Sequence, residues 1–255
     1  VGAALAADLA DVVDLGLDGL HQRLAVGERL DLLLHGLGAA VEIGKAPFEC
    51  RDRLLGLREL RAAQAMRVTS PAGTDLTVSL GGAAVGGVWG YTAKPGTVSH
   101  WPGGICLAFP KAHSVNGRLV LAPGDVNLTF KRYIETPIEL AIEDDYVRAI
   151  EGAGFDADMM RGYFAAWNDP QAYAVSHVGW GMNPGARWDA MTFYDRRDFN
   201  GTELRAFAGN FLYSTGANET AGRHTLGHFD LPMRNCTVTL DDRVVVDAGR
   251  LVGGV

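Results

Sequence analysis

Apolar residues recur at intervals of three and four over the first quarter of the chain. From Ala3 to Leu20, and again from Arg51 to Ala65, this spacing puts the apolar side chains on one face of a helix. Between these segments, the apolar run Leu30–Leu34 is followed by Gly36, which is typical of a buried strand or the end of a βα unit. The pattern predicts a partial α/β portion over residues 1–65. Because the chain begins at Val1, inside a helical pattern, we expect this portion to be truncated.

After Ala65 the pattern changes to short β-rich runs separated by glycine and proline. One helical stretch, Phe155–Trp167, interrupts them with an apolar face typical of core packing, and Asp169-Pro170 ends it. We therefore predict a strand-rich, mixed α+β domain over residues 66–255, which carries the chemistry. Its predicted strands are Asp75–Leu80, Ile105–Phe109, Leu119–Leu121, Ile138–Ile142 and Val244–Val246.

Charge and cysteine content narrow the class of protein. The net charge of -7 leaves no basic surface for a polyanion, so we do not expect a nucleic-acid partner. No stretch approaches the ~18 consecutive apolar residues of a membrane span, so no membrane partner is expected. Cys50, Cys106 and Cys236 are odd in number and widely spaced, which argues against a disulfide framework and favours reduced thiols in the cytoplasm.

The sharpest chemical signal is the segment Gly227–Pro232 (GHFDLP), in which His228 and Asp230 are two residues apart. On an extended backbone, residues i and i+2 point to the same face, so one short strand can present an imidazole and a carboxylate to one ion. A His-x-Asp pair is also common as a hydrogen-bonded structural couple. A metal site therefore needs a third ligand.

His177, in Ser176–Gly181 (SHVGWG), is the candidate for that ligand. The segment reads as a buried strand that ends in glycines. Two imidazoles and one carboxylate with open positions form the facial arrangement of Fe(II) oxygenases. The alternative for His177 is a core histidine that is satisfied by hydrogen bonds.

Other polar residues have simpler interpretations. Ser214 fits a helix terminus or a turn hydroxyl, and Glu219 and His224 are either partners of ligands or solvated loop residues. The Asp144-Asp145 and Asp241-Asp242 pairs are typical of hairpin turns. The sequence contains no nucleophile elbow, Walker loop, H-E-x-x-H or G-x-G-x-x-G motif.

From Thr69 to Leu251 the chain resembles the 2,5-dihydroxypyridine 5,6-dioxygenases, a branch of the aminopeptidase T-like fold family. Five segments in the same order carry the resemblance, which makes it far more specific than any one motif. They are Ser70–Asp75 (SPAGTD), Ser99–Gly104 (SHWPGG), Ser176–Gly181 (SHVGWG), Gly209–Gly216 (GNFLYSTG) and His228–Cys236 (HFDLPMRNC).

The resemblance implies a reaction and a ligand set. His177, His228 and Asp230 would bind one Fe(II) per chain and serve as the catalytic residues, with the Ser214 hydroxyl as a weaker ligand. The expected reaction opens the ring of 2,5-dihydroxypyridine, or a related hydroxylated N-heterocycle, with O2 to give N-formylmaleamate. The resemblance also implies a homo-oligomer.

Two positions separate this sequence from the peptidases of the broader family. Those enzymes carry metal-binding glutamates where this chain has Ile105 and His177. A dinuclear site uses bridging carboxylates to hold two cations about 3.5–4 Å apart, and isoleucine cannot ligate a metal. The alternatives to the dioxygenase are a metal-dependent aminopeptidase and a non-catalytic remnant that keeps the metal site.

The residues that contact the substrate are harder to place. His100 and Trp101 could line the pocket, with Trp101 either stacking on a planar heterocycle or packing in the core. In the family a Leu-His pair of the N-terminal domain guides the ring. Leu20 and His21 are the best positional match for that pair, and Leu34-His35 is the second.

Overall fold

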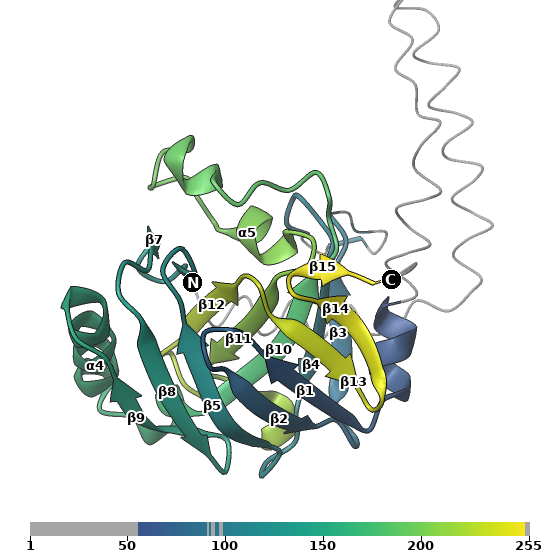
Figure 1. The fold of residues 1–255 in the computed structure, drawn as a ribbon, viewed down its shortest axis with the longest axis horizontal. Coiled ribbons are helices and arrows are strands. Elements are labelled where there is room, and N and C mark those ends of the chain that lie inside the picture. Colours follow the sequence, from purple (N-terminus) through teal and green to yellow (C-terminus); the bar gives the residue numbers. More distant parts are fainter. Residues whose placement is uncertain (1–55, 91, 93–94, 97–98, 253–255) are drawn as a thin grey trace, which may run out of the picture.

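The computed structural model describes residues 56–90, 92, 95–96 and 99–252, and Figure 1 shows their arrangement. Residues 56–62 form a helix that leads directly into the first strand. The strands are β1 (Ala65–Thr69), β2 (Asp75–Ser79), β3 (Ala84–Val88), β4 (Ile105–Phe109), β5 (Val115–Leu121), β6 (Val126–Asn127), β7 (Arg132–Tyr133), β8 (Ile138–Glu143), β9 (Tyr146–Glu151), β10 (Val175–Gly181), β11 (Phe211–Thr215), β12 (Phe229–Met233), β13 (Thr237–Leu240), β14 (Arg243–Asp247) and β15 (Arg250–Leu251). The helices are α4 (Phe155–Trp167) and α5 (Thr202–Ala206), with 3-10 turns η2 (Pro170–Tyr173), η3 (Ala190–Thr192) and η4 (Glu219–Ala221).

The described strands form two main antiparallel sheets. The larger sheet has the order β15-β14-β13-β1-β2-β5-β8-β9, the smaller has the order β12-β11-β10-β4-β3, and β6 pairs with β7 alone. Figure 1 shows the larger sheet lying across the smaller one. An antiparallel sheet can bury one face in a core while its other face stays outside that core.

The core lies between the two sheets, and this decides which side chains of the smaller sheet remain for function. Val178 and Trp180 of β10 and Tyr213 of β11 are buried in one apolar cluster with Met66 and Leu76 of the larger sheet. Side chains alternate between faces along a strand. The neighbouring residues on β10, β11 and β12 therefore project from the opposite face of the smaller sheet.

Helix α4 covers one end of this core. Asp156 and Asp158 in its first turn favour the helix N-terminus, and Asn168 ends it in the left-handed conformation with φ 47°. Its buried Phe164 packs edge-on against Phe229 of β12, with the ring centroids 4.8 Å apart. The helix thus lies against the strand that follows His228.

The structure confirms most of the elements expected from the pattern. Strands lie in each of the five predicted runs, and α4 has the predicted bounds. The helix predicted to end at Ala65 is wrong in its last residues, because Ala65 begins β1 and pairs with Ser79. The predicted α/β portion falls almost entirely outside the described residues, so the division at residue 65 stays a prediction.

Two further expectations can be compared with the described residues. Cys106 and Cys236 are buried free thiols, whereas Cys50 lies outside the described ranges. Among the described helices, none has the length and apolar character needed to cross a membrane.

Candidate metal centre

Three adjacent strands bring the predicted ligands together. His177 of β10 lies opposite Ser214 of β11, and Ser214 lies opposite Asp230 of β12. His228 is two residues before Asp230 and directly precedes β12. The structure thus assembles all four side chains on one face, and they are called the donor cluster below. The interpretation of Ser214 as a turn or helix-terminus hydroxyl is wrong, because Ser214 is a fully buried strand residue.

One carboxylate oxygen, Oδ1 of Asp230, is shared by the whole donor cluster. It lies 3.2 Å from Nε2 of His228 and 3.6 Å from Nε2 of His177, and it accepts a hydrogen bond from the Ser214 hydroxyl. Two ligands with bonds of about 2.1 Å to one ion, at angles of 90–110°, are separated by about 3.0–3.4 Å. The spacing of the nitrogen and oxygen donors is therefore close to what a single first-row metal requires.

The side chains of the donor cluster also contact one another directly, through hydrogen bonds and ion pairs. As the side chains stand, no group of three or more His, Cys, Asp or Glu residues within the described ranges is arranged to hold a metal ion. Oδ1 of Asp230 is instead engaged by the Ser214 hydroxyl and by His228. A bound ion would have to replace these direct contacts.

Burial and charge set the protonation of the cluster. Burial lowers the pKa of His177 to about 4 against the pull of Asp230, so this imidazole is neutral near neutral pH. Burial also opposes a charge on His228, but the charge and hydrogen bond of Asp230 outweigh it and raise the pKa of His228. For Asp230, burial favours the neutral acid, yet His228 and Arg205 together hold its pKa well below the usual range. The carboxylate is therefore ionised.

Arg205 is a residue of this site that the sequence reasoning missed. Its Nε lies 3.2 Å from Oδ2 of Asp230, and its guanidinium also donates to the carbonyl oxygen of Asn200 at 2.6 Å. The ion pair engages the Oδ2 side of the carboxylate and leaves Oδ1 facing the two imidazoles. The sequence gives no indication of this role, because Arg205 is a single arginine between Leu204 and Ala206, in the segment that forms the short helix α5.

The surroundings leave one open side. The side chain of His228 is 35% exposed, whereas the side chains of His177 and Asp230 are each 8% exposed, so the cluster is reached from the His228 side. The backbone of His228 is held by Tyr163 of α4, whose hydroxyl accepts from His228 N at 3.2 Å. The ring of Phe109 lies 5.2 Å from the ring of His177 and gives this imidazole an apolar neighbour.

The predicted substrate residues are not brought to the cluster by any recorded contact among the described residues. His100 and Trp101 lie in the connection from β3 to β4, which joins the end of β4 away from His177. Trp101 is 77% exposed, so the core-packing alternative for it is wrong. Leu20 and His21, like Leu34-His35, lie outside the described residues. A role in substrate binding stays a prediction for all of them.

Two polar residues near the cluster in sequence have no recorded contact with it. Glu219 and His224 are exposed on the segment that follows β11. The backbone nitrogen of His224 donates to the side-chain oxygen of Gln171 at 2.7 Å. These positions agree with solvated loop residues.

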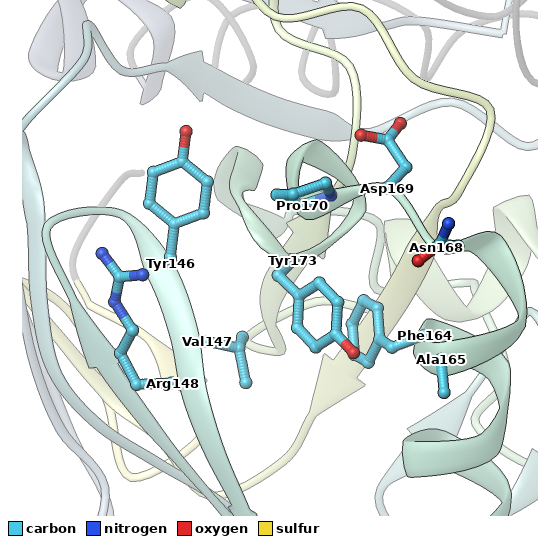
Figure 2. Close-up of a pocket in the computed structure, with 9 residues that line it drawn as sticks. All are labelled: Tyr146, Val147, Arg148, Phe164, Ala165, Asn168, Asp169, Pro170 and Tyr173. Carbon is cyan, nitrogen blue, oxygen red and sulfur yellow. The ribbon is translucent and has the colours of Figure 1, made fainter.

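A surface pocket of about 390 Å³ lies between β9, α4 and η2. Figure 2 shows Phe164 and Tyr173 side by side in it, with their rings stacked at a centroid distance of 4.3 Å. Asp169 is the one carboxylate among its lining residues, and it accepts from the backbone of Gln171. No member of the donor cluster lines this pocket, so it adds nothing to the candidate metal centre.

A profile of the 2,5-dihydroxypyridine 5,6-dioxygenase family matches residues 49–253. The chain belongs to the 2,5-dihydroxypyridine 5,6-dioxygenase family. A 2,5-dihydroxypyridine 5,6-dioxygenase from Pseudomonas putida KT2440 is 44% identical over 195 residues, which are 76% of this chain and 55% of that protein. The chain thus spans about half the length of this curated dioxygenase.

Solved structures agree with this membership. The structure of a 2,5-dihydroxypyridine dioxygenase from Pseudomonas putida KT2440 matches with a TM-score of 0.76 and 42% identity, over 80% of this chain and 59% of that one. AmpT from Thermus thermophilus matches with a TM-score of 0.57 and 18% identity, over 82% of this chain and 56% of that one. The AmpT match shows a common fold, which is the α+β fold predicted for the family.

Proposed function

We propose that this chain carries the Fe(II) site of a ring-cleaving dioxygenase that opens 2,5-dihydroxypyridine with O2 to give N-formylmaleamate. The observation that carries the proposal is the meeting of two imidazoles and one carboxylate around Oδ1 of Asp230 on three adjacent strands. This is the donor set of mononuclear Fe(II) oxygenases. Bound iron would supply the redox chemistry that makes O2 reactive beside the ring.

The side chains around the site have separate tasks in this proposal. His177, neutral and buried, and His228 offer nitrogen donors, and Asp230 offers Oδ1 because Arg205 engages its other oxygen. The exposed edge of His228 marks the side from which a planar heterocycle reaches the iron. Phe109 lies against the ring of His177 and adds an apolar neighbour beside this donor.

The apolar surroundings of Ile105 argue for one metal ion rather than two. Ile105 is 1% exposed and packs with Leu107 and Leu212 beside β10. A second cation there would meet hydrocarbon instead of the anionic donors that offset its dehydration. This favours the dioxygenase over an aminopeptidase with two metal ions.

The test is anaerobic reconstitution of the chain with Fe(II), followed by addition of 2,5-dihydroxypyridine and O2. We expect loss of the substrate with equal consumption of O2, and a product with the mass of N-formylmaleamate. The sum of substrate and O2 equals the product in atoms, so no further reactant is needed. Zinc-loaded protein and His228→Ala that has been treated with Fe(II) in the same way are the matched controls, and both should be inactive.

Two results would contradict the proposal. Release of amino acids from peptides by protein that contains two metals per chain would favour the aminopeptidase. Tight binding of Fe(II) without any O2 consumption would favour the non-catalytic remnant.

A further inference from the structure

Strand β10 contains a bulge directly before His177. In its pairing with β11, Val175 lies opposite Thr215 and His177 lies opposite Ser214, so Ser176 is an extra residue without a partner. In a regular strand, neighbouring side chains point to opposite faces. A bulge changes these directions, and here Oγ of Ser176 comes to 3.0 Å from Nδ1 of His177.

The hydrogen bonds of Ser176 determine which nitrogen of His177 carries the proton. Oγ lies 2.6 Å from the carbonyl oxygen of Ala217. A carbonyl can only accept, so the single hydroxyl hydrogen of Ser176 is donated to Ala217. Oγ then has only lone pairs to offer His177, and Nδ1 must be the protonated nitrogen. Nε2, which faces Asp230, keeps its lone pair.

We infer that Ser176 is a positioning residue, which holds His177 in the tautomer that binds a metal ion through Nε2. The hydrogen bond at one ring nitrogen sets which nitrogen is free for a metal, and it also fixes the orientation of the ring. Ser176 is 3% exposed and His177 is 6% exposed, so bulk water has little access to replace the hydroxyl. The inference rests on the proposed function because it takes His177 as a ligand.

The first measurement needs no metal. In the metal-free, 15N-labelled chain, the ring nitrogens of His177 are observed by NMR and assigned with His177→Gln. We expect the proton on Nδ1 in the wild type and in Ser176→Thr, which keeps the hydroxyl. Ser176→Ala should populate the other tautomer. Ser79→Ala removes an exposed hydroxyl from β2 and serves as the control without effect.

The second measurement is the affinity of the same proteins for Co(II), followed by its visible absorption. Loss of a hydrogen bond that orients a metal-bound histidine weakens binding by about 10–100-fold, which we expect for Ser176→Ala but not for Ser176→Thr or Ser79→Ala. If wild type and His177→Gln bind Co(II) equally, His177 is not a ligand and the proposed function itself fails.

A different set of results would overturn this inference alone. Co(II) binding that depends on His177 but has the same affinity in Ser176→Ala would exclude a positioning role. If Ser176→Ala does not fold, the wild-type spectrum still decides, because a proton on Nε2 of His177 would contradict the assignment.

Discussion

A buried ion pair between Asp145 and Arg223 holds the start of β10, the strand that carries His177. Both side chains are almost fully buried, with exposed fractions of 0% and 6%. Asp145 accepts hydrogen bonds from the backbone nitrogens of His113, Ser114 and Val115 at 2.6, 2.8 and 2.7 Å, as well as from Arg223. Arg223 also donates to the carbonyl oxygen of Val175 at 3.0 Å. We expect Asp145→Ala to destabilise the fold severely.

The magnitude follows from what the substitution leaves behind. Removing one partner of a buried ion pair costs about 3–5 kcal/mol, because the other charge stays buried without compensation. Three backbone N–H groups lose their acceptor as well; that of Val115 is buried, and a buried, unsatisfied group costs about 1–3 kcal/mol. Whole proteins are stable by only about 5–15 kcal/mol. Asp145→Ala should therefore remove most of the stability, whereas Asp145→Asn keeps one oxygen acceptor and should lose less.

The assay is urea unfolding of the metal-free chain, with Asp145→Ala, Arg223→Met and the double variant in one thermodynamic cycle. We expect the effects of the single variants to be strongly non-additive, since each one alone leaves the charge of the other partner buried without its counter-ion. Asp75→Ala, which breaks the exposed ion pair with Arg67, is the control with a far smaller effect. Equal effects of Asp145→Ala and Asp75→Ala would refute the reasoning.

Three further predictions concern the ligands, the pH dependence and the backbone. Ser214→Ala should keep its iron but show altered turnover, whereas His228→Ala should lose its iron and its turnover, because a hydroxyl is a weaker ligand than an imidazole. Equal loss of iron from the two variants on dialysis would contradict this order of ligand strength. Burial raises the pKa of Asp125 from 3.8 to about 6, so its contribution to stability is present below pH 3.8 and is lost as the pH rises to about 6. Asp125→Asn should flatten this slope in unfolding measurements at several pH values, and an unchanged slope would count against it. In α4, the Cβ added by Gly162→Ala meets no atom within 4 Å, so this substitution should raise the free energy of unfolding by about 0.5–1 kcal/mol. Gly179→Ala would place a Cβ 1.9 Å from the carbonyl oxygen of Cys106 and should lower the free energy of unfolding. Melting temperatures that change in the same direction in both variants would contradict these two predictions.

The strands and the main helix were predictable because their signals are local. Short β-rich runs separated by glycine and proline predicted β2 and β8, and the helical pattern of Phe155–Trp167 was bounded by Asp169-Pro170. The prediction that His228 and Asp230 share a face needed only the geometry of one extended segment. The order of strands in the sheets needed pairings between residues far apart in the chain, which no local pattern contains.

The residues that support the ligands could not be predicted for the same reason. Arg205 approaches Asp230 from a five-residue helix 25 positions earlier, and the sequence holds no repeat or spacing that links the two. No feature of the sequence pairs Ser176 with His177, because the side chains of neighbours on a regular strand point to opposite faces. The bulge that brings it to His177 depends on the pairing of β10 with β11. Asp144-Asp145 was correctly predicted as a turn, with φ 51° and 75°, but the burial of Asp145 was not.

The most direct test of the account is the number of Fe(II) ions that one chain binds under anaerobic conditions. Equilibrium dialysis followed by iron analysis should give one ion per chain for the wild type and close to none for Asp230→Asn, which removes the charge of the oxygen donor shared by the cluster. Arg67→Gln breaks the exposed ion pair with Asp75, which is distant in sequence from the donor cluster, and should bind one ion like the wild type. Two ions per wild-type chain, or one ion that remains in Asp230→Asn, would contradict a single iron site at His177, His228 and Asp230.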